Sequence, residues 1–138
     1  MASRDKKDLF PTLVQSYELA CTAYKAKYPN ASQPFLTCTY RTIDEQNKLY
    51  EQGRTAKGQK VTNAKGGESA HNFNPSPAFD IGFITLNQTL DWDNKNFKNF
   101  AEIVKSITTS IEWGGDFKSI KDAPHFELKN WKLLVGKK

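Results

Sequence analysis

The sequence predicts an α+β fold in which a small antiparallel sheet carries helices packed on one face. In some segments apolar residues recur every three or four positions, which indicates helices. In others they alternate with polar residues, which indicates strands. The 138 residues show no internal repeat and no linker-like stretch, so we expect residues 1–138 to form a single domain.

The first predicted elements are a helix and a strand. Residues 10–28 carry apolar side chains at helical spacing, and Pro29 follows directly, so we expect an amphipathic helix that ends there. Residues 35–40 are rich in β-branched and aromatic side chains and predict a short strand.

A second helix is predicted immediately after this strand. Thr42 and Glu45 have the spacing of a capping box, which opens a helix that runs to about Gln52. Arg41 therefore lies at a junction between strand and helix, where side chains often point into a cleft. An arginine here could also simply pair with Glu45 or Asp44.

The middle of the chain predicts a long loop followed by a strand. Residues 54–69 are rich in glycine, lysine, asparagine and threonine and have no apolar period, and long loops in small domains are often functional. Residues 78–84 alternate clearly, with Phe79, Ile81 and Phe83 on one face. Asp80 is expected on the opposite face, away from the core.

The last predicted elements are a third helix and a final strand. The apolar residues that mark this helix are Phe97, Phe100, Val104, Ile107 and Ile111. A second loop follows Trp113, and residues 125–128 alternate as a strand.

The two histidines of the chain, His71 and His125, each lie close to a turn and a carboxylate. Two imidazoles, one carboxylate ligand and one open position are the usual arrangement of a catalytic zinc site. If the phenylalanine faces of both strands pack inward, Asp80 and His125 project from the other side of the same sheet. His71, Asp80 and His125 are therefore the candidate zinc ligands. Asp122 precedes an Ala-Pro turn that would let it act as general base.

Four motifs resemble a known family over residues 35–128. They are Ser69-x-His71, Ala78-x-Asp80, Trp113-Gly114-Gly115-Asp116-Phe117 and Asp122-x-x-His125-x-Glu127. The pattern is similar to the zinc peptidases that cut peptidoglycan stem peptides, which include D-alanyl-D-alanine carboxypeptidases, D-Ala-D-Ala dipeptidases and the L-alanyl-D-glutamate endopeptidases of phage endolysins.

The resemblance implies a hedgehog/DD-peptidase-like fold and Zn²⁺ as the cofactor. It also implies zinc ligation by His71, Asp80 and His125, with Asp122 as the catalytic base. By the same resemblance, Arg41 would stabilise the developing oxyanion. The sequence places eight residues between His71 and Asp80, including two prolines, where the family usually has six.

Four further residues of these motifs are candidates for substrate contacts or for supporting the ligands. Ser69 could hydrogen-bond substrate or merely end the loop, and Trp113 fits the core better than a substrate platform. Asp116 is an alternative base to Asp122. Glu127 could orient a ligand histidine or face solvent.

The charge and the cysteine content of the chain limit the binding partners and the cross-links that we expect. The net charge of +5 suits an anionic cell-wall polymer, but the basic residues are scattered and no nucleic-acid motif appears, so we expect no nucleic-acid partner. Cys21 and Cys38 do not form a disulfide framework, and Cys21 is expected to be a buried free thiol on the first helix. We expect a monomer.

The N-terminal residues lack the apolar core of a signal peptide, and no stretch is long enough to span a bilayer. We therefore expect no membrane insertion and residence in the host bacterial cytoplasm until release to the cell wall. The favoured function is an L-alanyl-D-glutamate endopeptidase of the phage endolysin type, acting on the peptidoglycan stem peptide and causing lysis. The alternatives are a D-alanyl-D-alanine carboxypeptidase or dipeptidase, and a wall-binding module with a structural metal.

Overall fold

The computed structural model describes residues 2–118 and 121–136. The elements in chain order are the 3-10 helix η1 (Lys6–Asp8), helix α1 (Pro11–Lys27), strand β1 (Gln33–Cys38), helix α2 (Ile43–Glu51), the 3-10 helix η2 (Ala70–Asn72), strand β2 (Ala78–Ile84), helix α3 (Asn94–Ile107), strand β3 (Ile111–Trp113), the 3-10 helix η3 (Gly114–Asp116), strand β4 (His125–Leu128) and helix α4 (Trp131–Leu134).

The four strands form one antiparallel sheet in the order β1-β2-β4-β3. In the β2–β4 pair, Asp80 lies directly opposite His125, and Phe79 lies opposite Phe126. Successive side chains of a strand point to opposite faces, so the phenylalanines share the core face while Asp80 and His125 share the other. The two strands are therefore adjacent, which a metal site shared by Asp80 and His125 requires.

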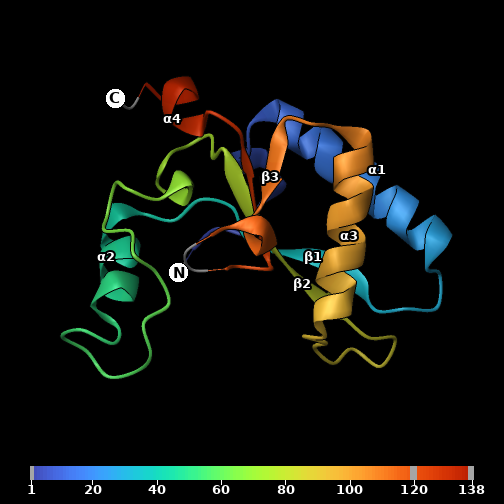
Figure 1. The fold of residues 1–138 in the computed structure, drawn as a ribbon, viewed down its shortest axis with the longest axis horizontal. Coiled ribbons are helices and arrows are strands. Elements are labelled where there is room, and N and C mark those ends of the chain that lie inside the picture. The colour runs from blue at the N-terminus through green and yellow to red at the C-terminus, as the bar shows by residue number, and fades with distance from the viewer. Residues whose placement is uncertain (1, 119–120, 137–138) are drawn as a thin grey trace.

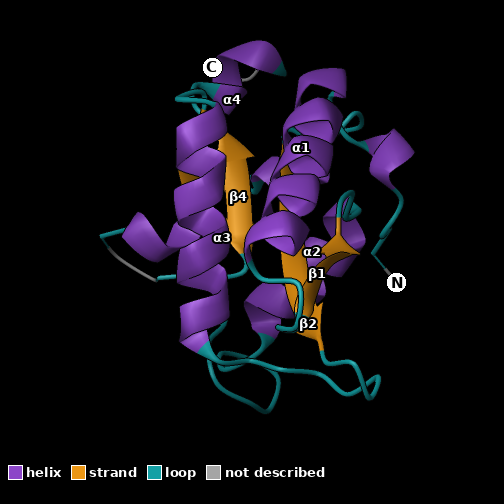
Figure 2. Ribbon diagram, turned by 90° about the vertical axis from the view of Figure 1, so that its right-hand side faces the viewer, coloured by secondary structure: helices purple, strands orange, loops and turns teal. Residues whose placement is uncertain are grey.

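Helices α1 and α3 cover the core face of the sheet (Figures 1 and 2). Phe79 stacks on Phe126 with ring centroids 5.3 Å apart, and Phe100 from α3 meets Phe126 edge-on at 5.6 Å. All three rings are fully buried. Burying one phenylalanine side chain contributes about 1.5–3 kcal/mol, so these rings hold the central strands firmly against the two helices.

Helix α2 and the long loop after it lie on the opposite side of the sheet from α1 and α3 (Figure 1). The capping box predicted for this helix is present. The hydroxyl of Thr42 accepts a hydrogen bond from the backbone N–H of Glu45 at 3.1 Å, and the carboxylate of Glu45 accepts one from the N–H of Thr42 at 2.8 Å. Gly53 follows the helix with a left-handed φ of +81°, a conformation that favours glycine.

Three element predictions need correction. Ile111 was expected on the third helix but begins β3, where it pairs with Leu128. The first strand begins at Gln33 and ends at Cys38, about two residues earlier than predicted. The short helix α4 was not predicted. The α+β fold with a small antiparallel sheet is confirmed, and its two long helices, α1 and α3, pack on one face as expected, whereas α2 lies on the other side. None of the described helices is long and apolar enough to cross a membrane.

Candidate metal centre and catalytic cleft

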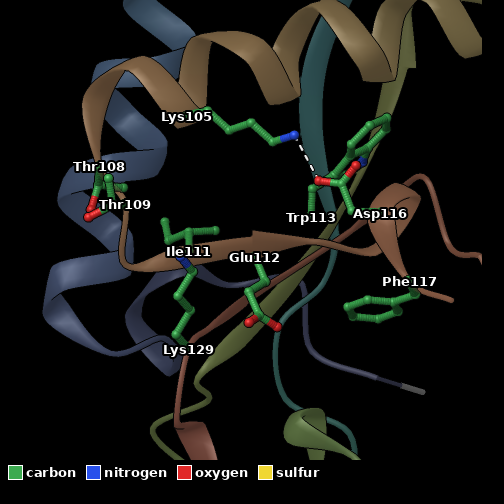
Figure 3. A pocket seen from close by; sticks show the side chains of 9 residues that line it. All are labelled: Lys105, Thr108, Thr109, Ile111, Glu112, Trp113, Asp116, Phe117 and Lys129. Atoms are coloured by element: carbon green, nitrogen blue, oxygen red, sulfur yellow. Dashed lines mark ion pairs between the residues drawn. The ribbon is translucent and has the colours of Figure 1, made fainter.

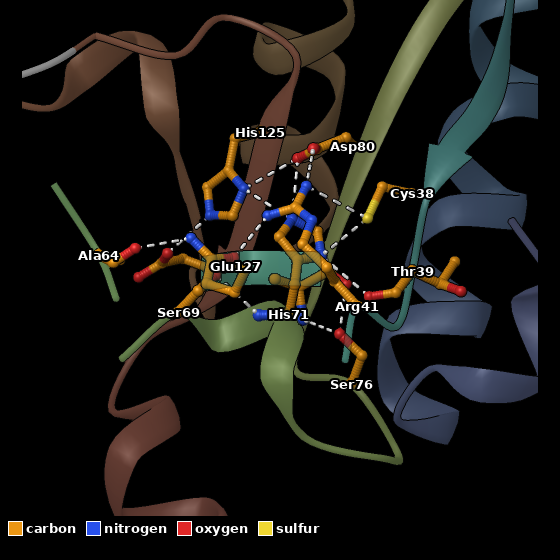
Figure 4. Close-up of polar contacts among 12 residues, drawn as sticks. Cys38, Thr39, Arg41, Ala64, Ser69, His71, Ser76, Asp80, His125 and Glu127 are labelled. Atoms are coloured by element: carbon orange, nitrogen blue, oxygen red, sulfur yellow. Dashed lines mark hydrogen bonds and ion pairs between the residues drawn. The ribbon is translucent and has the colours of Figure 1, made fainter. Parts of the chain in front are cut away.

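Three ligand-type atoms from different segments converge on the outer face of the sheet (Figure 4). His71 Nε2 lies 3.1 Å from Asp80 Oδ1 and 3.2 Å from His125 Nδ1, and the third side of the triangle, His125 Nδ1 to Asp80 Oδ1, is 2.9 Å. Both histidines are buried. The three residues expected as zinc ligands are thus brought together.

Each imidazole makes a hydrogen bond on the side that faces away from Asp80, and this bond shows which ring nitrogen carries the hydrogen. His71 Nδ1 lies 2.9 Å from the backbone oxygen of Thr39, which can only accept, so Nδ1 donates and Nε2 keeps its lone pair. His125 Nε2 lies 2.7 Å from Glu127 Oε1, so Nε2 donates and Nδ1 keeps its lone pair. Both free lone pairs face the carboxylate of Asp80.

This donor set fits zinc. Three electron-rich atoms facing one another at 2.9–3.2 Å need a cation between them. Zinc bonds of about 2.0–2.1 Å in a tetrahedron place ligand atoms roughly 3.3 Å apart. Two imidazoles and one carboxylate also leave a fourth position for water or substrate. A structural site would be closed by a fourth protein ligand, so the arrangement favours catalysis.

The electrostatics of His71, Asp80 and His125 without a metal also favour the binding of a cation. Burial disfavours the charged imidazolium of His71, but the Asp80 carboxylate outweighs it and raises the pKa to about 10. Burial is likewise outweighed at His125, where hydrogen bonds to Asp80 and Glu127 raise the pKa to about 9. The site therefore attracts positive charge, and a bound metal would displace these protons.

Backbone hydrogen bonds hold His71 in place. Ser69 caps η2, its hydroxyl accepting from the N–H of His71 at 3.2 Å. The N–H of Arg41 donates to the carbonyl of His71 at 2.8 Å, which ties η2 to the β1–α2 junction. The side chain of Ser69 therefore holds the backbone of His71, and Ser69 also lines the cleft. A contact of Ser69 with substrate stays a prediction.

The proline-containing turn between His71 and Asp80 is anchored to the N-terminal segment. The N–H of Ser76 donates to the carbonyl of Asp8 at 2.6 Å, and the N–H of Phe10 donates to the carbonyl of Ser76 at 3.0 Å. The buried Ser76 hydroxyl also bonds to the backbone of Ala78. The eight intervening residues are therefore accommodated without moving His71 out of reach of Asp80.

Asp122 lies in the turn that precedes β4, as its Ala-Pro sequence predicted. The N–H of Asp122 donates to the carbonyl of Gly114 at 3.0 Å, and a Cβ at Gly114 would collide with the carbonyl of Asp122. The carboxylate has an oxygen within 4.8 Å of the ligand atoms of Asp80 and His125. Asp122 is exposed as a whole residue, but neighbouring protein atoms desolvate its carboxylate and raise its pKa, and the nearby Asp80 charge raises it further.

Arg41 reaches the same cleft from the β1–α2 junction. Its Nη2 lies 3.8 Å from Asp80 Oδ2, and its Nη1 donates to Gln46 Oε1 at 2.8 Å. Gln46 is fully buried, and its Nε2 donates to the carbonyl of Ala64 in the long loop at 2.8 Å. Arg41 therefore pairs with neither Asp44 nor Glu45 among the ion pairs found in the described residues.

The cleft around the triangle has a volume of about 800 Å³ and is lined by Arg41, His71, Asp80, Asp122, His125 and Glu127, together with residues of the long loop and of α4. Trp113 and Asp116 do not line it. The indole N–H of Trp113 donates to the carbonyl of Ala123 at 2.7 Å, and Asp116 forms a surface ion pair with Lys105 at 2.7 Å.

Sequence reasoning overlooked two neighbours of the site, Gln46 and Cys38. The thiol sulfur of Cys38 lies 3.6 Å from His71 Nδ1 and 3.5 Å from a guanidinium nitrogen of Arg41. Neither residue belongs to a recognisable motif. The other cysteine, Cys21, is a free thiol but only half-buried, and partial burial raises its pKa to about 11.

A sheet that carries a His–Asp–His triangle open on one side, with a carboxylate beside it, defines the class of single-metal hydrolases. Comparison with known proteins narrows this class. Residues 62–128 match the family described as D-alanyl-D-alanine carboxypeptidase. The chain is 39% identical over 129 residues to the peptidoglycan L-alanyl-D-glutamate endopeptidase CwlK of Bacillus subtilis (strain 168), covering 88% of this chain and 74% of that protein.

Two solved structures share the fold. The L-Ala D-Glu endopeptidase ChiX of Serratia marcescens has a TM-score of 0.65 at 20% identity, covering 94% of this chain and 89% of that chain. A mutant of the vancomycin resistance D,D-pentapeptidase VanY in complex with Zn(II) has a TM-score of 0.63 at 14% identity, covering 93% and 76%.

The chain belongs to the zinc D-Ala-D-Ala carboxypeptidase and L-alanyl-D-glutamate peptidase family. It is a zinc metallopeptidase, and the sequence-based assignments of family, fold class, enzyme class and cofactor are confirmed.

Proposed function

We propose that this enzyme hydrolyses peptidoglycan stem peptides at the bond between L-alanine and D-glutamate. The observation that carries the chemistry is the triangle of lone pairs formed by His71, Asp80 and His125, which is open on one side. The choice of bond is supported by the 39% identity to an endopeptidase of that specificity.

The residues of the cleft have separate roles in this proposal. His71, Asp80 and His125 hold zinc, and Thr39 and Glu127 orient the two imidazoles through their second nitrogens. When bound, zinc supplies a Lewis acid that polarises the scissile carbonyl and acidifies a water molecule.

Asp122 is the proposed general base and acid. Its carboxylate lies beside the ligand atoms, and its raised pKa brings it closer to the range in which a carboxyl group both takes and returns a proton. It accepts the proton of the attacking water and then delivers it to the leaving amine of D-glutamate.

Arg41 is the proposed electrostatic stabiliser. Its guanidinium is fixed by Gln46 and faces the cleft beside Asp80. A fixed cation at this point favours the charge that develops on the carbonyl oxygen in the transition state, and preorganisation makes such a contact effective.

Identifying the new termini in digested peptidoglycan tests the proposed bond. Purified sacculi treated with the zinc-loaded enzyme should release fragments whose new amino terminus is D-glutamate. Release of D-alanine or of D-Ala-D-Ala instead would establish the carboxypeptidase or dipeptidase alternative. Binding to sacculi without any new terminus would favour a wall-binding module with a structural metal.

We further propose that the enzyme is a phage-type endolysin, which waits in the host cytoplasm and acts once the membrane has been opened. The net charge of +5 would attract it to the anionic wall. Expressed in a bacterial cytoplasm, the enzyme should leave cells intact until a membrane-permeabilising agent is added, after which they should lyse. Lysis without permeabilisation would contradict the proposed release step.

We also propose that the enzyme is a monomer. Size-exclusion chromatography with light scattering should give the mass of a single chain.

A further inference from the structure

A second cavity adjoins the catalytic cleft at β3, the last strand on one side of the sheet order. Its volume is about 380 Å³, within the range of about 300–1,000 Å³ that is usual for small-molecule sites. Figure 3 shows the side chains that surround it, drawn from the end of α3, from β3 and η3, and from the residue after β4.

The two cavities share a wall. Phe117 lines both, and its ring centroid lies 5.8 Å from that of the ligand His125. Glu112, in the second cavity, is the in-register neighbour of Glu127, which lines the catalytic cleft. A molecule that occupies the second cavity therefore lies beside Phe117, a side chain that also lines the catalytic cleft.

The lining suits a polar ligand without net charge. Phe117 provides aromatic surface. The ring of Trp113 lies beneath the ammonium of Lys105, 5.5 Å from the ring centroid, and its indole N–H is already satisfied by a backbone carbonyl. Two lysines and two carboxylates balance each other. Lys105 and Asp116 form an ion pair at 2.7 Å, which Figure 3 marks with a dashed line, while Glu112 and Lys129 contribute one charge of each sign.

A sugar ring has the matching chemistry, because one of its faces is apolar and its rim carries hydroxyl groups that donate and accept hydrogen bonds. An aromatic ring can pack against the apolar face of the sugar while neighbouring charged side chains bind its hydroxyl groups. A polyanion would gain nothing from a lining with balanced charges.

The proposed substrate carries a sugar close to the scissile bond, and in this respect the inference rests on the proposed function. In peptidoglycan, the amino group of the L-alanine is joined to the lactyl group of N-acetylmuramic acid. An extended residue spans about 3.3–3.6 Å, so the sugar begins roughly two such lengths from the scissile carbonyl.

We propose that the second cavity is a subsite for the N-acetylmuramic acid sugar on the amino-terminal side of the scissile bond. The remainder of the stem peptide is the competing occupant. It carries ionised carboxylates, for which the balanced lining offers no net attraction.

The test compares two substrates that differ only in the sugar. One is a stem tripeptide attached to a disaccharide of N-acetylglucosamine and N-acetylmuramic acid, and the other is the same peptide with a free lactyl group on its amino terminus. The wild-type enzyme should show a higher kcat/KM for the glycosylated substrate. In the double variant Glu112→Ala/Lys129→Ala, the ratio of the two kcat/KM values should fall about tenfold.

The matched control is Lys98→Ala/Glu102→Ala, which removes the same charges from exposed positions of α3 outside the cavity. It should leave the ratio unchanged. A wild-type enzyme that does not distinguish the substrates would overturn the proposal. So would a double variant that loses the same factor on both, because the cavity would then hold peptide.

A binding measurement separates this proposal from the proposed function. The probe is the same disaccharide with its lactyl group capped by L-alanine amide, titrated into the zinc-loaded enzyme while the indole N–H resonances are followed by NMR. A Trp113→Phe variant assigns the relevant signal. A saturable shift at Trp113 that Glu112→Ala/Lys129→Ala weakens supports the subsite even if another bond is cut, and no shift at millimolar probe refutes it.

Discussion

The carboxylates of the cleft differ in their surroundings, and these differences separate their tasks. Asp80 lies between two imidazoles, which outweigh its burial and hold its pKa well below the usual range. Asp122 has no such partner at hydrogen-bond distance in the described residues, and burial together with the Asp80 charge raises its pKa. One carboxylate is therefore suited to bind a cation permanently and the other to exchange a proton.

The role of Asp122 leads to the first prediction. Asp122→Asn should lower kcat by a factor on the order of 10² to 10⁴, because the amide cannot accept the proton of the attacking water. Zinc content should remain at the wild-type level, since the three ligand residues are untouched. Activity on a sugar-free stem peptide and metal analysis of the same preparation measure the two effects.

Asp116→Asn is the matched control for this substitution. Asp116 was the alternative base, but its carboxylate pairs with Lys105 and does not line the catalytic cleft. We expect its kcat on the sugar-free peptide to stay within a factor of about three of wild type, as is common for an exposed ion pair. Equal losses in both variants would contradict the assignment of Asp122.

Gln46 is a positioning residue that acts through Arg41. Its amide accepts from the guanidinium and donates to Ala64, so it fixes Arg41 relative to the long loop. Gln46→Leu should lower kcat by roughly 10- to 100-fold with little change in KM, because a cation that moves stabilises the transition state less well. Gln46→Glu, which keeps an acceptor for Arg41, should recover part of kcat.

Asn47 offers the control for Gln46. It also joins α2 to the long loop, since its side-chain oxygen accepts from the N–H of Gly66 at 2.7 Å, but among the hydrogen bonds and ion pairs of the described residues it has none to Arg41. Asn47→Ala should therefore leave kcat near the wild-type value. A fall in kcat as large as that of Gln46→Leu would show that loop attachment, and not the position of Arg41, is what matters.

At the residue scale, the sequence allowed the principal site residues to be chosen but not their contacts. His71, Asp80, His125 and Asp122 were found because histidines are scarce, each lies near a turn and a carboxylate, and the surrounding motifs resemble a known family. Their roles stay predictions until the variants are measured. Gln46 could not be found, because a buried glutamine on a short helix has no sequence signal.

At the scale of elements, helix α2 carries Gln46 and begins at a capping box, so the cap should matter for stability. Thr42→Ala removes the hydroxyl that accepts from the N–H of Glu45 and should lower the free energy of unfolding by about 1 kcal/mol. Urea unfolding of the zinc-loaded enzyme, followed by circular dichroism, measures the difference.

Thr42→Ser is the companion variant, because serine restores an acceptor at the same position. Its midpoint should lie close to that of wild type. If Thr42→Ser were destabilised as much as Thr42→Ala, the effect would come from the lost methyl group and not from the hydrogen bond of the cap.

Local sequence patterns predicted the helices and strands in which apolar residues recur at a clear period. They failed for short elements. Residues 78–84 and 125–128 were identified because their alternation is uninterrupted. Ile111 was assigned to the third helix because it falls four residues after Ile107, yet it is buried as the first residue of β3. A strand of three residues is specified by its pairing with β4, which no local pattern reveals.

At the scale of the whole molecule, a metal held by the three candidate ligands would join segments that are distant in the chain. His71 comes from η2, Asp80 from β2 and His125 from β4, so the same contacts that build the catalytic centre also cross-link the fold. The sequence indicated the candidate ligands and the antiparallel sheet, but the direct pairing of Asp80 with His125 is a matter of strand register. That register depends on which faces of the strands are buried against α1 and α3.

Metal removal should therefore destabilise the whole domain. Without a cation, the lone pairs of the triangle must be protonated or repel one another, whereas zinc at 100 times its dissociation constant adds about 2.7 kcal/mol. We expect a chelator to lower the Tm by on the order of 10 °C, and added zinc to restore it. Calcium should not restore it, because calcium prefers oxygen ligands and two of the three donors here are imidazole nitrogens. In the variant His71→Ala, which lacks one donor, the Tm should no longer respond to zinc. If the chelated wild type kept its full Tm, the triangle would not be the site that holds the metal.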